Sequence, residues 1–341
     1  MQDILSLNIY QLDDIIKLSG CPPYRSKQVY NWLHKNMVTT FEEMTNIPKS
    51  LRTNLQQKFY IPSPTTLKCL VSTDESVKYL FKFSENIILE SVLMKSKYGY
   101  TICVSTQIGC KMGCTFCASH RNGFVQNLTT GQILSQVYTI QKNLNKKISN
   151  IVIMGIGEPL DNYDASVNFI RIISSKDGLN LSQRNITIST CGIVNKMYDL
   201  AEEGLNVTLA ISIHAGDDII RKQIMPIANR FTIDEIQQAA TNYFNKTRRR
   251  VSYEYALIKD INDTKDQAIK LSQRLRHTPS HVNLIPLNPV SESGYLTSEG
   301  AKIKAFSKIL EDSNISTTIR TNKGQDINAA CGQLRLETIL N

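Results

Sequence analysis

Long hydrophobic runs are missing from this sequence of 341 residues. No stretch approaches the roughly 20 consecutive apolar residues that a membrane helix needs. The first residues, MQDILSLNIYQLDD, lack the basic and then apolar segments of a secretory signal peptide. Short-period repeats, low-complexity tracts and long linkers are absent as well. These absences predict a globular protein of the cytoplasm with no membrane partner.

Cysteine is scarce, but it is concentrated in one place. The chain has eight cysteines, and three of them fall within residues 110–117. Because the cytoplasm keeps thiols reduced, a framework of structural disulfides is not expected. Metal binding or catalysis is the better explanation for the cysteines of such a protein.

Negative charge is in deficit. Lysine and arginine number 39 against 30 aspartates and glutamates, which gives a formal net charge of +9 at pH 7. A positive charge suits a partner rich in phosphate, such as RNA. The densest basic run, KTRRR at 246–250, is also typical of a solvated helix face. Charge alone therefore makes RNA plausible as a partner and does not establish it.

The hydrophobic pattern divides the chain into three parts. In residues 1–62 apolar residues recur at helical spacing, as in IYQLDDIIKL and SKQVYNWLHKNM, which predicts a small helical domain. In residues 63–98 the period changes to two, in TTLKCLV, VKYLFKF and NIILESVLM, so we expect a short antiparallel β segment. Residues 99–341 alternate between strand and helix patterns, which predicts an α/β fold with a parallel sheet, either open or closed into a full or partial barrel.

Four unusual segments lie at the ends of strands predicted in this third part. A cysteine loop follows YTICVST, GEPL follows IVIMGI, STCG ends NITIST, and HAG follows LAISI. In a parallel α/β sheet or barrel, function lies at the carboxyl ends of the strands. The four segments are therefore predicted to meet at one rim of the fold, where we expect the functional site.

The segment GCKMGCTFCAS places Cys110, Cys114 and Cys117 in one loop with C-x3-C-x2-C spacing. His120 follows shortly after and could complete a Cys3His zinc site. Zinc fingers usually draw pairs of ligands from two separate segments, however, whereas several thiolates in one loop are common in iron–sulfur proteins. Three thiolates around four irons leave one iron open, and an open metal position is typical of a catalytic site.

This cysteine loop resembles that of the radical S-adenosylmethionine (SAM) enzymes, in which it follows the first strand of a partial (β/α) TIM-like barrel. Within that superfamily the chain resembles the branch that methylates adenine C2 in RNA, and the resemblance runs over nearly the whole chain. The segments that carry it are PYRSKQVYNWL, FEEMTNIPKSLR, ESVLM, GCKMGCTFCAS, MGIGEPLDN, ISTCGIV, AISIHA, MPI, HVNLIPLNP and DINAACGQL.

The resemblance implies one 4Fe–4S cluster on Cys110, Cys114 and Cys117, with SAM as the ligand of the fourth iron. It implies two SAM molecules per turnover, one that methylates a cysteine of the enzyme and one that is split to a 5′-deoxyadenosyl radical. The implied substrates are an adenosine of the peptidyl-transferase centre in 23S ribosomal RNA and an anticodon-loop adenosine in tRNA. The small helical domain would help to bind the RNA.

The same resemblance implies a methyl carrier, a resolving thiol and a base. Cys331, in AACGQL, would carry the methyl group as S-methylcysteine. Cys103 would then release the methylated RNA by attacking the sulfur of Cys331, which leaves a transient disulfide. Glu90 would accept the proton from C2.

Local sequence patterns bear on two of these residues. Alternation in YTICVST places Cys103 on a small, polar strand face with Thr101 and Ser105, whereas an inert core cysteine should point the other way. Glu90 shares a strand face with apolar residues of NIILESVLM, where a carboxylate costs free energy unless it is paired or its pKa rises. A raised pKa would suit a general base. Without the resemblance, an edge-strand glutamate that reaches solvent would be the preferred interpretation of Glu90.

Several residues at the predicted rim are SAM contacts by resemblance. Glycines in MGIGEPL allow a ligand to approach the backbone closely, and the glutamate there can accept hydrogen bonds from an ammonium group. Alone, this segment would more often be an ordinary βα turn. The residues that the resemblance assigns to SAM are Gly157, Glu158, Ser189, Ser212, Ile213, His214 and Asn288.

The partners expected for such an enzyme are ribosomal RNA, tRNA, an electron donor such as flavodoxin or ferredoxin, and a thiol reductant, and we expect a monomer. Two alternatives stay open. The sister branch of the family, which methylates C8 of the same ribosomal adenine, shares the cysteines, although GEPL and LIPLNP are more similar to the C2 branch. A zinc-holding RNA-binding module without catalysis would contain about one zinc and no iron.

Overall fold

The computed structural model describes residues 1–276 and 279–335. One ten-stranded sheet organises the molecule, in the order β14-β13-β12-β11-β10-β9-β6-β5-β4-β3. From β6 to β14 every neighbouring pair is parallel, whereas β3, β4 and β5 join the sheet as antiparallel strands. The bounds are β3 (Thr65–Val71), β4 (Val77–Ser84), β5 (Ile87–Ser96), β6 (Gly99–Cys103), β9 (Ile148–Ile153), β10 (Ile186–Thr190), β11 (Thr208–Ser212), β12 (Val251–Leu257), β13 (Ser280–Pro286) and β14 (Ser316–Ile319).

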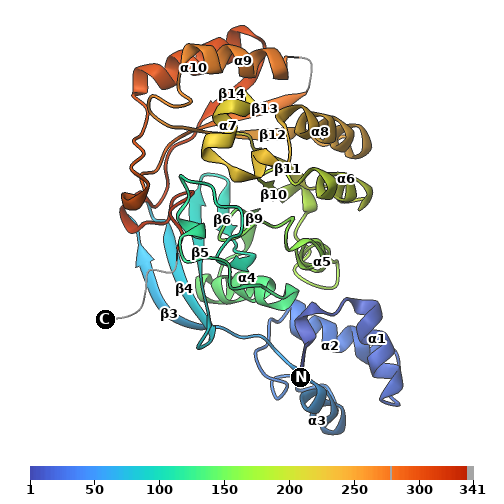
Figure 1. Ribbon diagram of the computed structural model, residues 1–341. Helices are drawn as coiled ribbons and strands as arrows, with labels where there is room; N and C mark the ends of the chain where they lie inside the picture. The colour runs from blue at the N-terminus through green and yellow to red at the C-terminus, as the bar shows by residue number, and fades with distance from the viewer. Residues whose placement is uncertain (277–278, 336–341) are drawn as a thin grey trace.

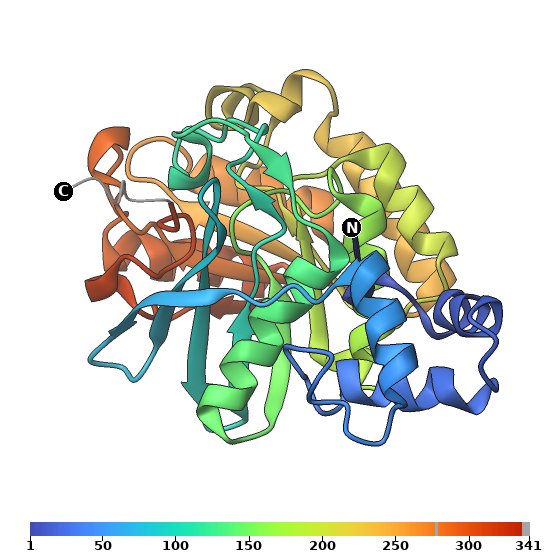
Figure 2. The same cartoon turned by 90° about the horizontal axis from the view of Figure 1, so that it is seen from below.

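Helices connect the parallel strands, and together they curve into an open barrel with β14 and β3 at its two edges (Figures 1 and 2). The α/β class and the partial barrel predicted from the sequence are therefore confirmed. The helix α4 starts at a capping box, in which Thr129 and Gln132 satisfy each other's backbone N–H groups. The helices of this part are α4 (Thr130–Leu144), α5 (Tyr163–Ile173), α6 (Val194–Glu202), α7 (Asp218–Ile224), α8 (Ile233–Thr247), α9 (Lys265–Leu275) and α10 (Gly300–Asp312).

Three further helices, α1 (Ile9–Leu18), α2 (Tyr24–His34) and α3 (Lys49–Lys58), form a unit beside α4 and α5 (Figure 1). Two short strands, β1 (Gln2–Asp3) and β2 (Phe59–Tyr60), pair in parallel and close this unit. Its buried side chains belong to the same hydrophobic cluster as those of the barrel. The helices predicted for this region are therefore present, and they are packed directly on the barrel.

Polar contacts between the N-terminal unit and α4 are buried. The carboxylate of Asp3 accepts hydrogen bonds from the Thr129 hydroxyl, at 2.5 Å, and from the N–H of Gly131, at 3.1 Å. A side chain at position 131 would meet the Asp3 carboxylate at 2.3 Å, so this close approach requires glycine. Further along α4, Tyr138 Oη lies 2.8 Å from His34 Nδ1 of α2.

The stretch 321–335, called here the C-terminal segment, lies beside β3, β4 and β5 (Figure 1). Asp326 accepts a hydrogen bond from Ser72 at 2.5 Å, and Asp74 accepts one from the N–H of Gly324 at 2.9 Å. The ammonium group of Lys78 donates to the carbonyl oxygen of Asn328 at 3.3 Å. Residues far apart in the sequence thus hold this segment over one face of the antiparallel strands.

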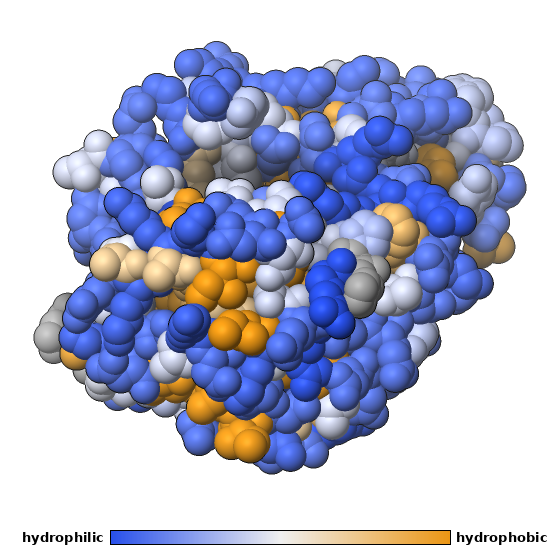
Figure 3. Space-filling model, turned by 90° about the horizontal axis from the view of Figure 1, so that it is seen from above, coloured by the Kyte–Doolittle hydropathy of each residue, from blue (hydrophilic) through white to orange (hydrophobic). Residues whose placement is uncertain are grey.

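Hydrophilic residues dominate the molecular surface in the view from above, and hydrophobic residues gather near the middle of that face (Figure 3). In the two described ranges, no helix is both long enough and apolar enough to cross a membrane.

Candidate active site

A cavity opens at the carboxyl ends of the parallel strands. It contains about 1010 Å³ of empty space, including the part that opens to solvent, and small-molecule sites typically have about 300–1,000 Å³. All four strand-end segments predicted to meet at the rim contribute to its wall. The predicted site residues that line the cavity are Cys110, Cys114, Cys117, Gly157, Glu158, Ser189, Ser212, His214, Asn288 and Cys331.

The cysteine loop is closed at its base by two short strands, β7 (Gln107–Ile108) and β8 (Gln126–Asn127), which pair in antiparallel fashion. Gly109 has a φ of 73°, and a Cβ there would lie 1.6 Å from the carbonyl oxygen of Gly123, so only glycine fits. The N–H of Thr115 donates to the carbonyl oxygen of Ile224 at 3.0 Å, which ties the loop to the end of α7. These contacts turn the loop toward the cavity.

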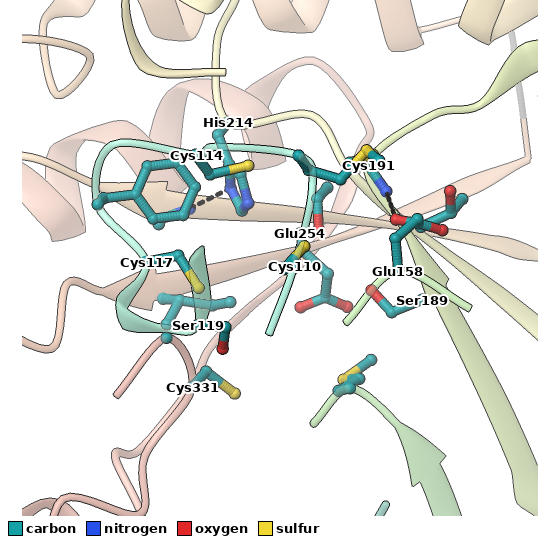
Figure 4. Close-up of a pocket in the computed structure, with 18 of the residues that line it drawn as sticks. Cys110, Cys114, Cys117, Ser119, Glu158, Ser189, Cys191, His214, Glu254 and Cys331 are labelled. Carbon is teal, nitrogen blue, oxygen red and sulfur yellow. Dashed lines mark hydrogen bonds between the residues drawn. The ribbon is translucent and has the colours of Figure 1, made fainter. Parts of the chain in front are cut away.

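The three thiols of this loop point toward one shared space (Figure 4). Burial raises the pKa of Cys110 to about 12 and raises that of Cys114 well above its usual value. Neutral thiols of this kind ionise when a positively charged metal binds, because a coordinating thiol is deprotonated. The donor set therefore fits a metal group with affinity for thiolates.

His120 does not complete this donor set. Its Nδ1 lies 2.7 Å from the carbonyl oxygen of Cys117, and the residue is not part of the cavity wall. Among the residues that the structure describes, no three histidine, cysteine or acidic side chains are grouped as ligands of a single metal ion. His120 therefore does not complete the Cys3His zinc site that the sequence allowed as an alternative.

The predicted SAM contacts differ in their surroundings. Glu158 is buried, and its two carboxylate oxygens accept hydrogen bonds from the N–H groups of Leu160, at 2.9 Å, and Cys191, at 2.8 Å. Burial raises its pKa. The side chains of Thr190 and Cys191 also hydrogen-bond to Glu158, so its carboxylate is held in a fixed direction at the cavity wall. Ile213 is buried outside the cavity wall, where its N–H donates to the carbonyl oxygen of Glu254.

His214 is held as a neutral ring at the cavity. Its Nδ1 accepts a hydrogen bond from the N–H of Ala256 at 2.8 Å (Figure 4). Burial and, to a smaller extent, the positive charge of Arg221 lower the pKa of His214 to about 3. Since Nδ1 is the acceptor, the ring proton is on Nε2.

Two buried oxygen atoms of the cavity wall have no hydrogen-bond partner in the structure. They are Oδ1 of Asn288 and Oε2 of Glu254. The other atom of the Asn288 amide, Nδ2, donates to the carbonyl oxygen of Cys331 at 3.2 Å. Buried polar atoms are nearly always hydrogen-bonded in native proteins, so these two atoms fit a polar ligand that supplies donors.

Cys331 faces the cavity from the C-terminal segment (Figure 4). The segment is held against the cysteine loop, because the N–H of Ala118 donates to Gly332 at 2.7 Å and the hydroxyl of Ser119 donates to Leu334 at 2.9 Å. Cys331 is an exposed residue, but the cavity wall around it desolvates the thiol. This desolvation raises the pKa of the thiol, whereas the positive charge of Arg320 lowers it. Cys331, the methyl carrier predicted from the sequence, thus lines the same cavity as the three loop cysteines.

Cys103 lies behind the cavity wall. It is buried in a small cluster with Val92, Ile156, Ala329 and Leu334. The pattern YTICVST predicted polar surroundings for Cys103. That prediction is wrong, because a neighbouring strand and the C-terminal segment supply apolar side chains. Burial raises the pKa of Cys103 to about 12, and the nearby Cys331 contributes to the shift. All eight cysteines are free thiols, so no disulfide joins these two residues in the structure.

Glu90 is also behind the wall, and its expected environment needs correction. It is neither an edge residue that reaches solvent nor a carboxylate among apolar neighbours alone. Its Oε1 forms an ion pair with Lys78 at 3.1 Å, and both side chains are buried. Its Oε2 accepts a hydrogen bond from the N–H of Arg335 at 2.9 Å. Glu90 and Lys78 together therefore contact the C-terminal segment on both sides of Cys331.

Sequence reasoning missed three charged residues near the site, namely Lys78, Glu254 and Arg320. Glu254 and Arg320 line the cavity. A signal was present for Glu254, because a glutamate in the otherwise uncharged strand VSYEYAL is costly to bury without a reason. Lys78 gave no such signal, since alternating lysines in VKYLFKF resemble a solvated strand face.

Two protein families match parts of the chain. Residues 2–61 match the ribosomal RNA large subunit methyltransferase N-terminal domain, and residues 104–271 match the radical SAM superfamily. Enzymes of that superfamily use SAM together with a 4Fe–4S cluster. The three-cysteine loop lies within the second match, as do most of the residues that line the cavity, whereas Asn288, Arg320 and Cys331 follow it in the chain.

Relatives match nearly the whole chain. The probable dual-specificity RNA methyltransferase RlmN of Lachnoclostridium phytofermentans is 50% identical over 98% of this chain and 94% of its own length. The protein of the same name from Clostridium tetani is 50% identical over 100% of this chain and 98% of its own length. The crystal structure of a radical SAM methyltransferase from Sphaerobacter thermophilus has a TM-score of 0.93 and 36% identity, and the match covers 98% of this chain and 99% of that one. The chain therefore belongs to the RlmN family of radical SAM RNA methyltransferases.

Proposed function

We propose that this enzyme methylates C2 of adenine in 23S ribosomal RNA and in tRNA, with one 4Fe–4S cluster per chain and two SAM molecules per turnover. The observation that carries the proposal is the position of Cys331, a free cysteine that shares one cavity with the three loop cysteines. C2 of adenine is not nucleophilic, so direct attack on the methyl group of SAM has a high barrier. A cysteine in this position can carry the methyl group instead.

The residues present fit the two absent groups. Cys110, Cys114 and Cys117 would hold the cluster, which when bound supplies the electron that splits SAM and so starts radical chemistry at the carried methyl group. The residues of the cavity wall that would hold SAM are Gly157, Glu158, Ser189, Ser212, His214 and Asn288, whereas Ile213, which the resemblance also assigns to SAM, lies outside this wall. The partnerless oxygen of Asn288 supports this assignment, as does the neutral ring of His214 at the cavity.

The protein supplies a carrier, a base and a second thiol. Cys331 loses its proton as its sulfur binds the methyl carbon, and it later links the enzyme to C2 of the adenine. Glu90, which forms a buried ion pair with the ammonium group of Lys78, accepts the C2 proton. Cys103 is a thiol until this step, because its pKa is raised. It loses its proton as it attacks the sulfur of Cys331, and the bond from that sulfur to the carried carbon breaks. The electron pair leaves with this carbon, which takes up a proton and becomes the methyl group of the released RNA. The disulfide that results needs two electrons from an external thiol reductant.

The three parts of the chain have separate roles in this proposal. Residues 1–62 would bind RNA, residues 63–98 would be the β segment that supports the C-terminal segment, and residues 99–341 would be the catalytic part. The target adenine must leave its stack to reach the cavity, at a cost of a few kcal/mol. We infer that the substrate is protein-free RNA, and that flavodoxin or ferredoxin reduces a monomeric enzyme.

The test is an anaerobic assay of product identity. The protein is reconstituted with iron and sulfide and is given SAM, a reductant and unmodified 23S ribosomal RNA or tRNA, after which nucleosides are identified by mass spectrometry. We expect 2-methyladenosine from the wild type and no methylated adenosine from Cys331→Ala. Cys69→Ala, which changes an exposed cysteine of β3, is the matched control and should retain activity. A product of 8-methyladenosine, or methylation by Cys331→Ala, would contradict the proposal.

A further inference from the structure

Glu254, a carboxylate in the cavity wall, has no assigned role. It lies on β12, is only 4% exposed, and points into the space between the cysteine loop and Cys331 (Figure 4). Its Oε1 accepts a hydrogen bond from Asn283 at 2.8 Å and lies 3.8 Å from the guanidinium group of Arg320. Its Oε2 is buried and has no partner in the structure.

The direction of this oxygen is set by neighbouring strands. Ser212 of β11, Glu254 of β12 and Asn283 of β13 are paired in register, so their side chains share one face of the sheet. The bond from Asn283 occupies Oε1 and fixes the carboxylate. Burial raises the pKa of Glu254, whereas Arg320 and the hydrogen bond from Asn283 lower it. A buried carboxyl oxygen without a hydrogen bond costs free energy unless a ligand supplies a partner.

The neighbours of Glu254 place it where the reacting groups must meet. Glu254 raises the pKa of Cys331, whereas Arg320 lowers it, so both charged groups lie within electrostatic reach of the carrier thiol. Ser212, on the other side, is one of the residues assigned to SAM. Ser212, Glu254 and Cys331 line the same cavity, so a ligand that spans Ser212 and Cys331 would lie beside Glu254.

We propose that Glu254 binds adenosine in the cavity, with Oε2 accepting a hydrogen bond from a ribose hydroxyl or from the 6-amino group. SAM and the target nucleotide both contain adenosine, so the same chemistry can come from either source. If the partner is the 6-amino group of the RNA adenine, the carboxylate also selects against guanine, because the 6-oxo group of guanine is an acceptor and would face a second acceptor. The inference rests on the proposed function only in that adenosine is the nucleoside bound.

The test substitutes Glu254→Gln, which keeps the shape and can keep the bond from Asn283 but replaces the free oxygen with an N–H donor. The first arm measures SAM binding to the cluster-loaded protein by equilibrium dialysis. The second arm measures KM and kcat with unmodified 23S ribosomal RNA at saturating SAM. Because one hydrogen bond to a charged group is worth roughly 1.5–3 kcal/mol, we expect about tenfold or greater weakening in one arm. Loss in the first arm identifies SAM as the source, and loss in the second arm alone identifies the RNA.

Glu202→Gln is the matched control, since Glu202 forms a surface ion pair with Lys246 at 2.9 Å, far from the cavity. Iron content and the unfolding midpoint are measured for each variant. If Glu254→Gln does not hold the cluster, Asn283→Ala carries the test, because it frees the carboxylate to rotate and should weaken the same arm by a smaller factor. Values within twofold of the wild type in both arms would overturn the inference. A wild type that binds SAM but methylates no adenine would contradict the proposed function, while the first arm would still decide the role of Glu254.

Discussion

The ion pair between Lys78 and Glu90 is buried in a place where burial of charge is costly. Their side chains are 6% and 4% exposed, and the pair lies between β4, β5 and the C-terminal segment. Burying two charges is compensated only when the geometry is good and further hydrogen bonds satisfy the remaining atoms. The backbone of Asn328 and Arg335 supplies such bonds here. The pair therefore fixes the position of Glu90, the proposed base, and holds the C-terminal segment, which contains Cys331.

We predict that Lys78→Met destabilises the protein by about 3 kcal/mol, because it removes the ammonium group that faces a buried carboxylate. The measurement is urea unfolding under anaerobic conditions. Lys82→Met is the control on the same strand, since Lys82 pairs with the exposed Glu85 and such surface pairs are worth about 1 kcal/mol or less. The double variant Lys78→Met/Glu90→Gln should recover most of the loss. A loss of equal size in the double variant would show that packing, and not charge, is responsible.

The site residues that sequence reasoning found are those whose signal is local. Cys110, Cys114 and Cys117 are recognisable because their spacing alone determines what they can hold. Lys78 and Glu254 depend on contacts made by segments up to 250 positions away in the chain. The charged partner of Glu90 therefore became visible only in the folded structure.

The elements themselves were predictable because each has a clear hydrophobic period. The parallel strands expected in YTICVST, IVIMGI, NITIST and LAISI are present, and so are the antiparallel strands in TTLKCLV, VKYLFKF and NIILESVLM. The C-terminal segment had no such period. Its only regular element is a short 3-10 helix, Gln325–Ile327, and its path depends on side chains of β4 and of the turn before it.

We predict that Asp326→Asn loosens the C-terminal segment, because Asp326 accepts hydrogen bonds from the Ser72 hydroxyl and from the N–H of Thr73. Trypsin should then cleave after Lys323 several times faster, and methylation of Cys331 should slow. Both are measured by mass spectrometry of digests over time. Asp312→Asn, which changes an exposed pair with Lys308 on α10, is the control and should alter neither. An unchanged cleavage rate at Lys323 would mean that other contacts hold the segment.

The contact between α2 and α4 joins the N-terminal unit to the barrel. His34 is fully buried there, its Nδ1 lies 2.8 Å from Tyr138 Oη, and its Nε2 has no partner in the structure. Burial lowers the pKa of His34 to about 3. The folded protein therefore keeps this ring neutral, whereas in the unfolded chain it takes up a proton near pH 6.5.

We predict that stability falls as the pH decreases from about 6.5 toward 3, because the unfolded chain binds a proton that folded His34 does not. The measurement is the thermal unfolding midpoint between pH 7.5 and 5 for protein without a cluster, so that loss of iron in acid does not contribute. His34→Gln should reduce the pH dependence without abolishing it, since buried His214 has the same sign of shift. An equal pH dependence in wild type and variant would show that other groups are responsible.

The position of Cys331 in the chain has a consequence for biosynthesis. The cysteine loop, the strands around it and the helices behind them are all translated before residues 321–335 leave the ribosome. During that interval the barrel lacks the C-terminal segment, which in the folded protein contacts Ala118, Ser119 and Asn288. Cys331, the proposed methyl carrier, is therefore made last, after the loop thiols that would hold the cluster.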